Sequence, residues 1–176
     1  VLVSTGTKQL QDQIYYTDLP ILRKALDVDF TATYMKGRGN YLCLHRFDAH
    51  RTKDTLPIDS NDIYVETIAE WSKHTQTGDR AEIEDLPDDF PFWSEVAATS
   101  ENCVGTECAQ YQECFVTKMR QRAPEADLVV VNHHFLCADA AVRQSDYGEV
   151  IPACAYSVID EAHQLEDVAT QYLSLI

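Results

Sequence analysis

The sequence predicts an α/β protein in which a parallel sheet is interrupted by a long, mostly helical insertion. Short apolar, β-branched runs occur at the start of the chain and again after residue 126, and helical patterns follow them. This alternation is typical of sheets buried between helices. The stretch between the two regions is acidic and interrupted by prolines, and three closely spaced cysteines mark its far end.

Four segments have the composition of strands. The run at 127–131, Asp-Leu-Val-Val-Val, suits a parallel strand buried on both faces. The run at 156–159 is expected to be buried in the same way, and 1–5 also looks like a buried strand. Residues 29–35 alternate polar and apolar side chains, which indicates a short strand.

The expected helices follow from apolar spacing and from capping residues. Pro20 is expected to kink or split the first helix, because proline lacks the N–H that a helix interior needs. Ser60 or Asn61 is the expected cap of the third helix, and Asn132 the cap of the sixth. The helices are predicted at 8–26, 41–47, 60 or 61 to about 78, 93–98, 111–122, 132–142 and from about 165.

Composition bounds the class of protein. The 176 residues are 45% hydrophobic, enough for a real core. No segment reaches the roughly 18 apolar residues of a membrane span, and no basic region followed by an apolar core begins the chain. We therefore expect a cytoplasmic protein. The chain starts within a strand-like run and stops without a terminating signal, so we expect an internal fragment.

Six cysteines in such a chain are expected to be ligands or core residues rather than disulfides. Cys137 and Cys154 lie among apolar neighbours and are predicted to be small buried core residues. The remaining four are candidate ligands of a metal or cluster: Cys43, Cys103, Cys108 and Cys114.

The spacing of these four leaves three interpretations open. Cys103, Cys108 and Cys114 form a C-x4-C-x5-C run, and Cys43 opens the insertion that the run closes. A [4Fe–4S] cluster needs one thiolate per iron. Four thiolates also suit zinc, although structural zinc sites usually pair two close C-x2-4-C knuckles. The third interpretation is that the cysteines are unrelated to each other.

An acidic tetrad follows the last strand-like run. Asp160-Glu161-Ala162-His163 comes directly after Ser157-Val158-Ile159, at the strand end where α/β sheets place their ligand chemistry. Such an Asp can hold Mg²⁺, usually through water, and the following Glu can polarise a water that attacks a phosphate. Acidic residues also end strands merely to solvate a loop, so four residues alone do not decide between these readings.

The net charge of −15 is unevenly distributed. Residues 54–102 hold thirteen of the 29 acidic residues and only two basic ones, a local balance of −11. That stretch is expected to be a solvated face. Basic residues instead gather near the candidate ligands, which suits a polyanion, although solvated charges on amphipathic helices are an equal alternative. They are Lys36, Arg38, Arg46, Arg51 and Lys53 around Cys43, and Lys118, Arg120 and Arg122 after Cys114.

Taken in order, these motifs resemble the bacterial DinG/YoaA-like branch of the XPD-type superfamily 2 helicases. The resemblance covers nearly the whole chain, and the paired histidines favour the bacterial branch. The segments that carry it are Val3-Ser4-Thr5-Gly6-Thr7-Lys8, Lys36-Gly37-Arg38-Gly39-Asn40-Tyr41-Leu42-Cys43, the three-cysteine run, Val130-Val131-Asn132-His133-His134 and Val158-Ile159-Asp160-Glu161-Ala162-His163.

The resemblance implies a partial RecA-like motor domain interrupted by an iron–sulfur domain. Residues 1–33 and 119–170 are expected to belong to the first helicase domain, the second of these ranges carrying a DEAH box. Residues 34–118 are expected to be the iron–sulfur domain, and 171–176 the start of an arch-like region. The implied activity is ATP-driven 5′→3′ translocation on single-stranded DNA and unwinding of duplex or forked DNA, in DNA repair and replication stress.

The resemblance also assigns roles to matching positions. Asp160 and Glu161 match the Mg²⁺-holding and water-activating pair, and His163 the residue that couples the nucleotide site to DNA movement. The implied cofactors are a [4Fe–4S] cluster with a mainly structural role, together with Mg²⁺ and ATP. The cluster ligands are expected to be Cys43, Cys103, Cys108 and Cys114, and the DNA contacts Ser4, Thr5, Thr7, Lys36 and Arg38.

In one respect the chain departs from the motifs of this family: it lacks their phosphate-binding loop. None of its six glycines is followed by Lys and then Ser or Thr, so no G-x-x-x-x-G-K-[ST] phosphate loop is present. In the family that loop lies upstream of the position matching Val1, and we expect this polypeptide alone not to hydrolyse ATP. Two other identities stay open: a zinc-stapled nucleic-acid-binding or protein-interaction module, and a DinG-like nuclease without a cluster.

Overall fold

The computed structural model describes residues 1–51, 62–84, 86–87, 89–144 and 149–173. Contacts between its residues divide the chain into two units. Unit 1 comprises residues 1–36 and 119–176, and unit 2 comprises residues 37–118. The predicted helix cap at Ser60 or Asn61 lies outside the described residues.

Unit 1 is built on a parallel sheet. Within the described residues the sheet has four strands in the order β2-β3-β1-β4, and every pairing is parallel. Ser4 is paired with Val131 on one side and with Ile159 on the other. The predicted α/β class with a parallel sheet is confirmed. The strands are β1 (Leu2–Thr5), β2 (Ala32–Tyr34), β3 (Leu128–Asn132) and β4 (Ser157–Ile159).

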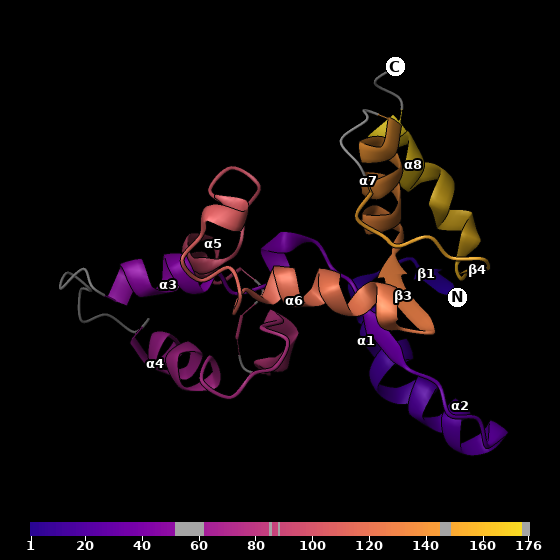
Figure 1. Ribbon diagram of the computed structural model, residues 1–176, viewed down its shortest axis with the longest axis horizontal. Coiled ribbons are helices and arrows are strands. Elements are labelled where there is room, and N and C mark those ends of the chain that lie inside the picture. Colours follow the sequence, from indigo (N-terminus) through magenta and orange to yellow (C-terminus); the bar gives the residue numbers. More distant parts are fainter. Residues whose placement is uncertain (52–61, 85, 88, 145–148, 174–176) are drawn as a thin grey trace. The chain divides into compact units, whose positions relative to one another are not determined.

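Helices lie on both sides of this sheet, α7 and α8 on one and α1 and α2 on the other (Figure 1). Asn132 caps α7 as predicted, its Oδ1 accepting from the backbone N–H of Phe135 at 2.8 Å. No helix in the described ranges combines the length and apolar character needed to cross a bilayer. The helical segments of unit 1 are α1 (Lys8–Gln13), a π-helical turn (Ile14–Asp18), α2 (Leu19–Leu26), the end of α6 (Phe115–Arg122), α7 (His133–Gln144), α8 (Leu165–Leu173) and 3-10 turns at Ala123–Glu125 and Ala162–Gln164.

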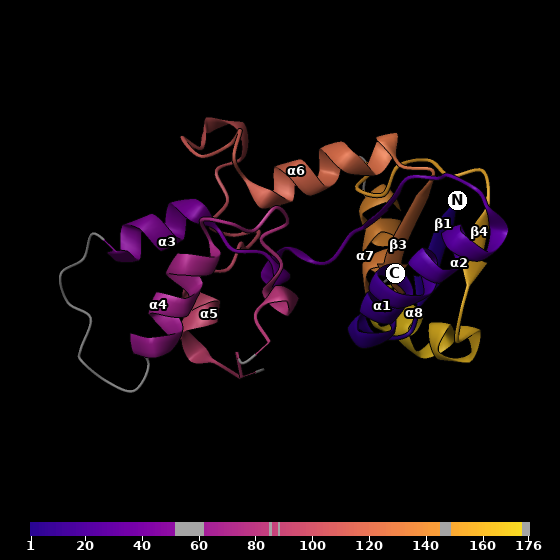
Figure 2. The same cartoon turned by 90° about the horizontal axis from the view of Figure 1, so that it is seen from below.

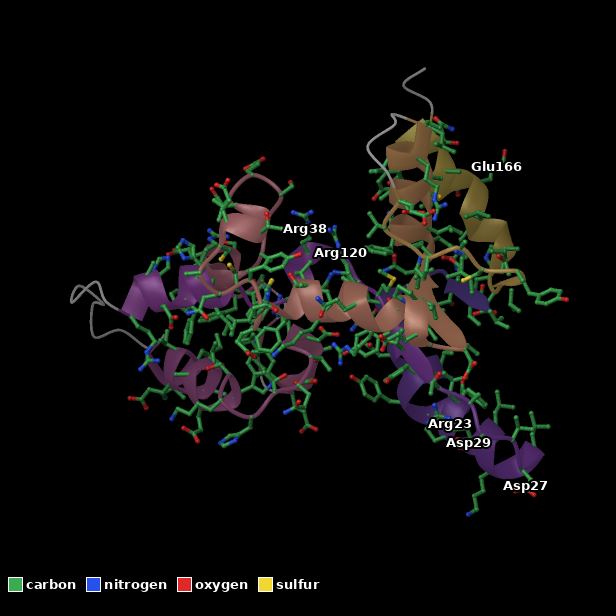
Figure 3. All side chains as sticks on the ribbon, in the orientation of Figure 1. Arg23, Asp27, Asp29, Arg38, Arg120 and Glu166 are labelled. Atoms are coloured by element: carbon green, nitrogen blue, oxygen red, sulfur yellow. The ribbon has the colours of Figure 1, made fainter. Side chains whose placement is uncertain are left out.

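The predicted helix at 8–26 is present, but Pro20 does not break it. A π-helical turn precedes Pro20, with the Leu19 N–H bonded to the Ile14 carbonyl five residues earlier. The wider turn accommodates the missing proline donor without ending the helix. Leu22 and Leu26, which share the apolar spacing of this helix, are 45% and 62% exposed. The outer end of α2, with Arg23 and Asp27, extends away from the sheet (Figure 3).

Two predictions about burial are wrong. β4 was expected to be a buried strand, yet Val158 is 53% exposed; β4 is one of the two edge strands and pairs only with β1. Cys154 was expected in the core but is half-buried, its thiol donating to the Pro152 carbonyl at 3.4 Å. Cys137 is buried as predicted, while β3 is buried over Val129–Val131 and supports the core beneath α1 and α2.

Unit 2 is mostly helical (Figure 2). The helix expected at 41–47 begins only at Leu44, because Tyr41 and Leu42 are extended and form antiparallel bridges to Asp79 and Ala97. Tyr41, Leu42, Phe47, Ile68, Trp93, Val96 and Phe115 form its buried interior. The helical segments are α3 (Leu44–Arg51), α4 (Asp62–Trp71), α5 (Pro91–Val96), the start of α6 and 3-10 turns at Arg38–Asn40, Arg80–Glu82 and Gly105–Glu107.

Candidate functional site

The acidic tetrad lies at the carboxyl edge of the sheet in unit 1. Because all strands run parallel, the residues that follow β1, β3 and β4 emerge at the same edge. Asp160 follows β4 and lies next to the end of β1, where its backbone N–H donates to the Ser4 carbonyl at 2.8 Å. The carboxylate is exposed to solvent, so a ligand can reach it.

A second hydrogen bond fixes the Asp160 side chain. The Thr5 hydroxyl, which is fully buried, donates to Oδ2 of Asp160 at 2.8 Å. A hydrogen bond to an ionised carboxylate is stronger than one between neutral groups. The side chain is therefore held both through its backbone and through one carboxylate oxygen.

Glu161 and His163 continue the tetrad in an uncommon backbone geometry. Glu161 has a φ of +51°, in the left-handed region that costs a non-glycine residue about 1 kcal/mol or more. Its Oε2 lies 3.5 Å from Nδ1 of His163, and both side chains are exposed. The paired carboxylates of Asp160 and Glu161 are oxygen donors of the kind that Mg²⁺ takes, together with water and phosphate. The donor chemistry thus fits the magnesium ion that the family implies.

The hydroxyl-rich turn after β1 has an inner and an outer part. Ser4 and Thr5 are fully buried, and Ser4 Oγ lies 2.7 Å from Nδ1 of His133. Thr7 is exposed, and its Oγ1 accepts from the Leu10 N–H at the start of α1. Of the three hydroxyls expected to touch DNA, only that of Thr7 is at the surface in this structure.

The two basic residues expected to contact DNA differ in exposure. Lys36 is 1% exposed, its Nζ lying 2.6 Å from Asp12 Oδ1 and 5.2 Å from the centre of the Tyr34 ring. A DNA contact by Lys36 would require it to leave this ion pair. Arg38, in unit 2, is half-buried. Arg120 on α6 is exposed and is labelled with Arg38 in Figure 3.

The four candidate ligand cysteines all belong to unit 2. Cys43 immediately precedes α3 and Cys114 immediately precedes α6. Burial raises the pKa of the Cys43 thiol, and the charges of Cys114 and Cys108 raise it further, while backbone N–H groups of Arg46 and His45 oppose the shift. The sulfur atoms of Cys108 and Cys114 therefore both lie close enough to Cys43 to affect it electrostatically.

As they stand, these thiols do not form a closed binding site. Among the described residues, no three His, Cys, Asp or Glu side chains converge closely enough to hold a metal ion. Cys103 is exposed, whereas Cys43, Cys108 and Cys114 are half-buried. The donor set fits a cluster in number and chemistry, one thiolate for each of four irons, but its ligand geometry is not formed.

The chain was also compared with known proteins. No family model matches it. The ATP-dependent DNA helicase YoaA of Haemophilus influenzae is 44% identical over 171 residues, which cover 97% of this chain and 27% of the relative. YoaA of Escherichia coli is 42% identical over 174 residues, covering 98% and 27%. The ATP-dependent helicase DinG of Mycobacterium tuberculosis is 33% identical over 188 residues, covering 97% and 28%.

The chain is a homologue of the YoaA/DinG helicases. It spans about a quarter of the length of the curated relatives that it matches. The family resemblance stated from the sequence is confirmed by these relatives.

In this YoaA/DinG homologue, one feature of the site was missed from the sequence. Thr5 was interpreted as a DNA contact or a helix-capping residue, whereas its hydroxyl holds Asp160 across 155 positions of sequence. The pairing of β1 with β4 brings the two together. Thr5 and Asp160 each follow a member of the paired residues Ser4 and Ile159. Their contact can therefore be predicted only when the strand order is known.

Proposed function

We propose that this chain is part of an ATP-dependent 5′→3′ DNA helicase that carries a [4Fe–4S] cluster and acts on single-stranded or forked DNA during repair or replication stress. The observation that supports it most is the position of Asp160: an exposed carboxylate at the carboxyl end of β4, held by Thr5, in a chain homologous to ATP-dependent DNA helicases. We propose a cytoplasmic location, because the proposed substrate, DNA, lies in the cytoplasm of bacteria.

In the proposed reaction, Asp160 orients a magnesium ion and Glu161 accepts the proton of the attacking water. When bound, Mg²⁺ would neutralise negative charge on the phosphates of the nucleotide. Asp160 and Glu161 differ in their partners: the Asp160 carboxylate accepts from Thr5, whereas Oε2 of Glu161 lies near His163, which suits separate tasks for the two acidic groups. His163, 3.5 Å from Glu161, is proposed to report the state of that carboxylate to the DNA-binding parts of the motor.

For unit 2 we propose that Cys43, Cys103, Cys108 and Cys114 ligate the cluster and that its role is mainly structural. The three-cysteine segment has few regular hydrogen-bonded elements apart from a 3-10 turn at Gly105–Glu107. Four bonds to one cluster would fix this segment against α3 and α6. Cys103 is the exposed member of the set, so the cluster would bury it.

The first experiment measures iron, acid-labile sulfide and zinc per chain in anaerobically purified protein, with the absorption spectrum. About four irons and four sulfides per chain, lost in Cys103→Ser, are expected from the ligand count. Cys137→Ser is the matched control, because Cys137 is buried in unit 1, and it is expected to retain the iron. Stoichiometric zinc without sulfide would instead support a zinc-stapled binding module.

The second experiment measures DNA-stimulated ATP hydrolysis and unwinding by the intact protein and by this chain alone. Glu161→Gln is expected to abolish hydrolysis in the intact protein while nucleotide binding remains. The 176-residue chain alone is expected to be inactive, since it has no phosphate loop. Magnesium-dependent hydrolysis by the pure 176-residue chain would overturn this expectation, and nuclease activity without unwinding would favour the DinG-like nuclease.

A further inference from the structure

Within the described residues, Thr5 is the one side chain that hydrogen-bonds the Asp160 carboxylate. Its hydroxyl bonds Oδ2, one of the two carboxylate oxygens, and Asp160 as a residue is exposed to solvent. Thr5 is itself fully buried at the end of β1, and a β-branched side chain on a strand has few rotamers available. The hydroxyl is thus a fixed donor, set by the sheet rather than by a mobile loop.

The residue after Thr5 adds a second close contact to the same acidic loop. A Cβ atom on Gly6 would lie 2.4 Å from Oε1 of Gln164, so the β1–α1 turn packs directly against the side chain of Gln164 in the 3-10 turn Ala162–Gln164. Ser4, Thr5 and Gly6 therefore contact the loop at three successive positions, through the Asp160 N–H, the Asp160 carboxylate and the Gln164 side chain.

We propose that Thr5 is a positioning residue for metal binding by Asp160, and that it acts by fixing the direction of the carboxylate rather than by touching DNA. The proposal rests on the proposed function, in which Asp160 orients magnesium. Partners that orient a ligating carboxylate change metal affinity or activity by roughly 10–100-fold when they are removed. Thr5 has the burial and the bond to be such a partner.

The test compares Thr5→Val, which keeps the shape and removes the hydroxyl, with Thr5→Ser, which restores it. Thr31→Val is the matched control, because the Thr31 hydroxyl also donates to an aspartate at 2.8 Å, Asp127 Oδ2, where β2 and β3 begin. The first readout is binding of Mn²⁺ to the intact protein in the presence of a non-hydrolysable ATP analogue, measured by electron paramagnetic resonance. The second is the Mg²⁺ concentration that half-saturates ATP hydrolysis.

We expect Thr5→Val to weaken Mn²⁺ binding about ten-fold and to raise the half-saturating Mg²⁺ concentration similarly, with single-stranded DNA affinity unchanged. Thr5→Ser is expected to restore both values, and Thr31→Val to alter neither. Unchanged metal binding in a folded Thr5→Val protein would overturn the proposal, and so would an equal effect of Thr31→Val. A loss of DNA affinity alone would return Thr5 to the DNA-contact role.

The same measurements distinguish a failure of the proposed helicase function from a failure of the proposed role of Thr5. If the unmodified intact protein neither binds Mn²⁺ with the nucleotide analogue nor hydrolyses ATP, the helicase assignment fails before Thr5 is considered. If the unmodified protein does both and Thr5→Val does so with the same metal dependence, only the role of Thr5 fails. Circular dichroism of each variant separates a loss of fold from a loss of metal binding.

Discussion

Gly78 is a residue at which two physical constraints coincide. Its φ is +67°, and an added Cβ would lie 2.2 Å from ring atoms of Phe115, which is buried. A left-handed backbone costs an alanine about 1–2 kcal/mol, and overpacking a core costs about 1–3 kcal/mol more. We therefore expect Gly78→Ala to destabilise unit 2 by about 2 kcal/mol or more.

Tryptophan fluorescence during denaturant unfolding measures this effect selectively, because both tryptophans, Trp71 and Trp93, lie in unit 2. Gly105→Ala is the matched control: its φ is +62°, but no atom lies within 4 Å of the added Cβ. The control is expected to lose only the backbone contribution. Equal destabilisation by the two variants would show that the contact with Phe115 is irrelevant.

Asp127 provides a prediction about pH at the amino ends of β2 and β3. The backbone N–H and the hydroxyl of Thr31 hold the pKa of its carboxyl below the ordinary value. A lowered carboxyl pKa stabilises the fold above the unfolded pKa, about 3.9 for Asp, and this contribution is lost as the pH falls through the folded pKa. We expect Thr31→Val to raise the pKa of Asp127 towards the ordinary value, as followed by a carboxyl-carbon NMR titration. A pKa that does not move would contradict the role of the hydroxyl.

At the scale of elements, Asp139 ties α7 to the chain segment before β4. Asp139 is 5% exposed, and its Oδ1 accepts from the N–H groups of Val150 at 2.6 Å and Ile151 at 3.0 Å, while Oδ2 accepts from Arg143 Nε at 2.6 Å. Asp139→Asn replaces one acceptor oxygen with an amide that donates. Either Arg143 or the two N–H groups then face a donor.

We expect Asp139→Asn to destabilise unit 1 by about 2 kcal/mol and to increase hydrogen exchange at the Ile151 amide. The control is Glu149→Gln, which removes the exposed partner of the same Arg143 and is expected to cost at most about 0.5 kcal/mol. Native-state hydrogen exchange by NMR measures both. Slow exchange at Ile151 in Asp139→Asn would count against the contact.

Some of the strands and helices could be predicted from the sequence, and others could not. The runs at 2–5 and 128–132 are recognisable because burial on both faces selects continuous β-branched and apolar residues, and Asn132 marks the start of α7. The exposure of β4 was not predictable, because Ser157–Ile159 has the same composition as a buried strand and only the strand order places it at the edge. The π-helical turn before Pro20 was also missed, since no residue pattern distinguishes it from a kink.

At the candidate site, the chemistry of the side chains could be predicted from the sequence, whereas their geometry could not. The types of Asp160, Glu161 and the four cysteines indicate what each group can bind. The inward direction of Thr5 and Lys36 depends on partners more than 20 positions away, Asp160 and Asp12. Hydroxyls and a lysine interpreted as surface groups are buried in this structure because their hydrogen bonds and ion pair are made inside unit 1.

At the scale of the whole molecule, unit 2 is continuous in sequence, whereas unit 1 is assembled from two segments. All strands of the described sheet lie in unit 1, and all four candidate cluster cysteines lie in unit 2. Unit 2 also has its own buried aromatic residues, Tyr41, Phe47, Trp93 and Phe115 among them. We therefore expect a polypeptide of residues 37–122, which keeps α6 whole, to fold without the sheet.

Expression of residues 37–122 tests this directly. Its tryptophan emission maximum is expected to match that of the complete chain, since Trp93 is 4% exposed and its indole N–H donates to the Gly39 carbonyl at 2.8 Å, within the same unit. Its iron and sulfide content per polypeptide is expected to match that of the complete chain as well, because residues 37–122 include all four candidate ligand cysteines. Trp93→Phe in the same polypeptide identifies the buried fluorophore. An emission maximum typical of a solvated indole, together with absence of iron, would mean that unit 2 depends on unit 1 to fold.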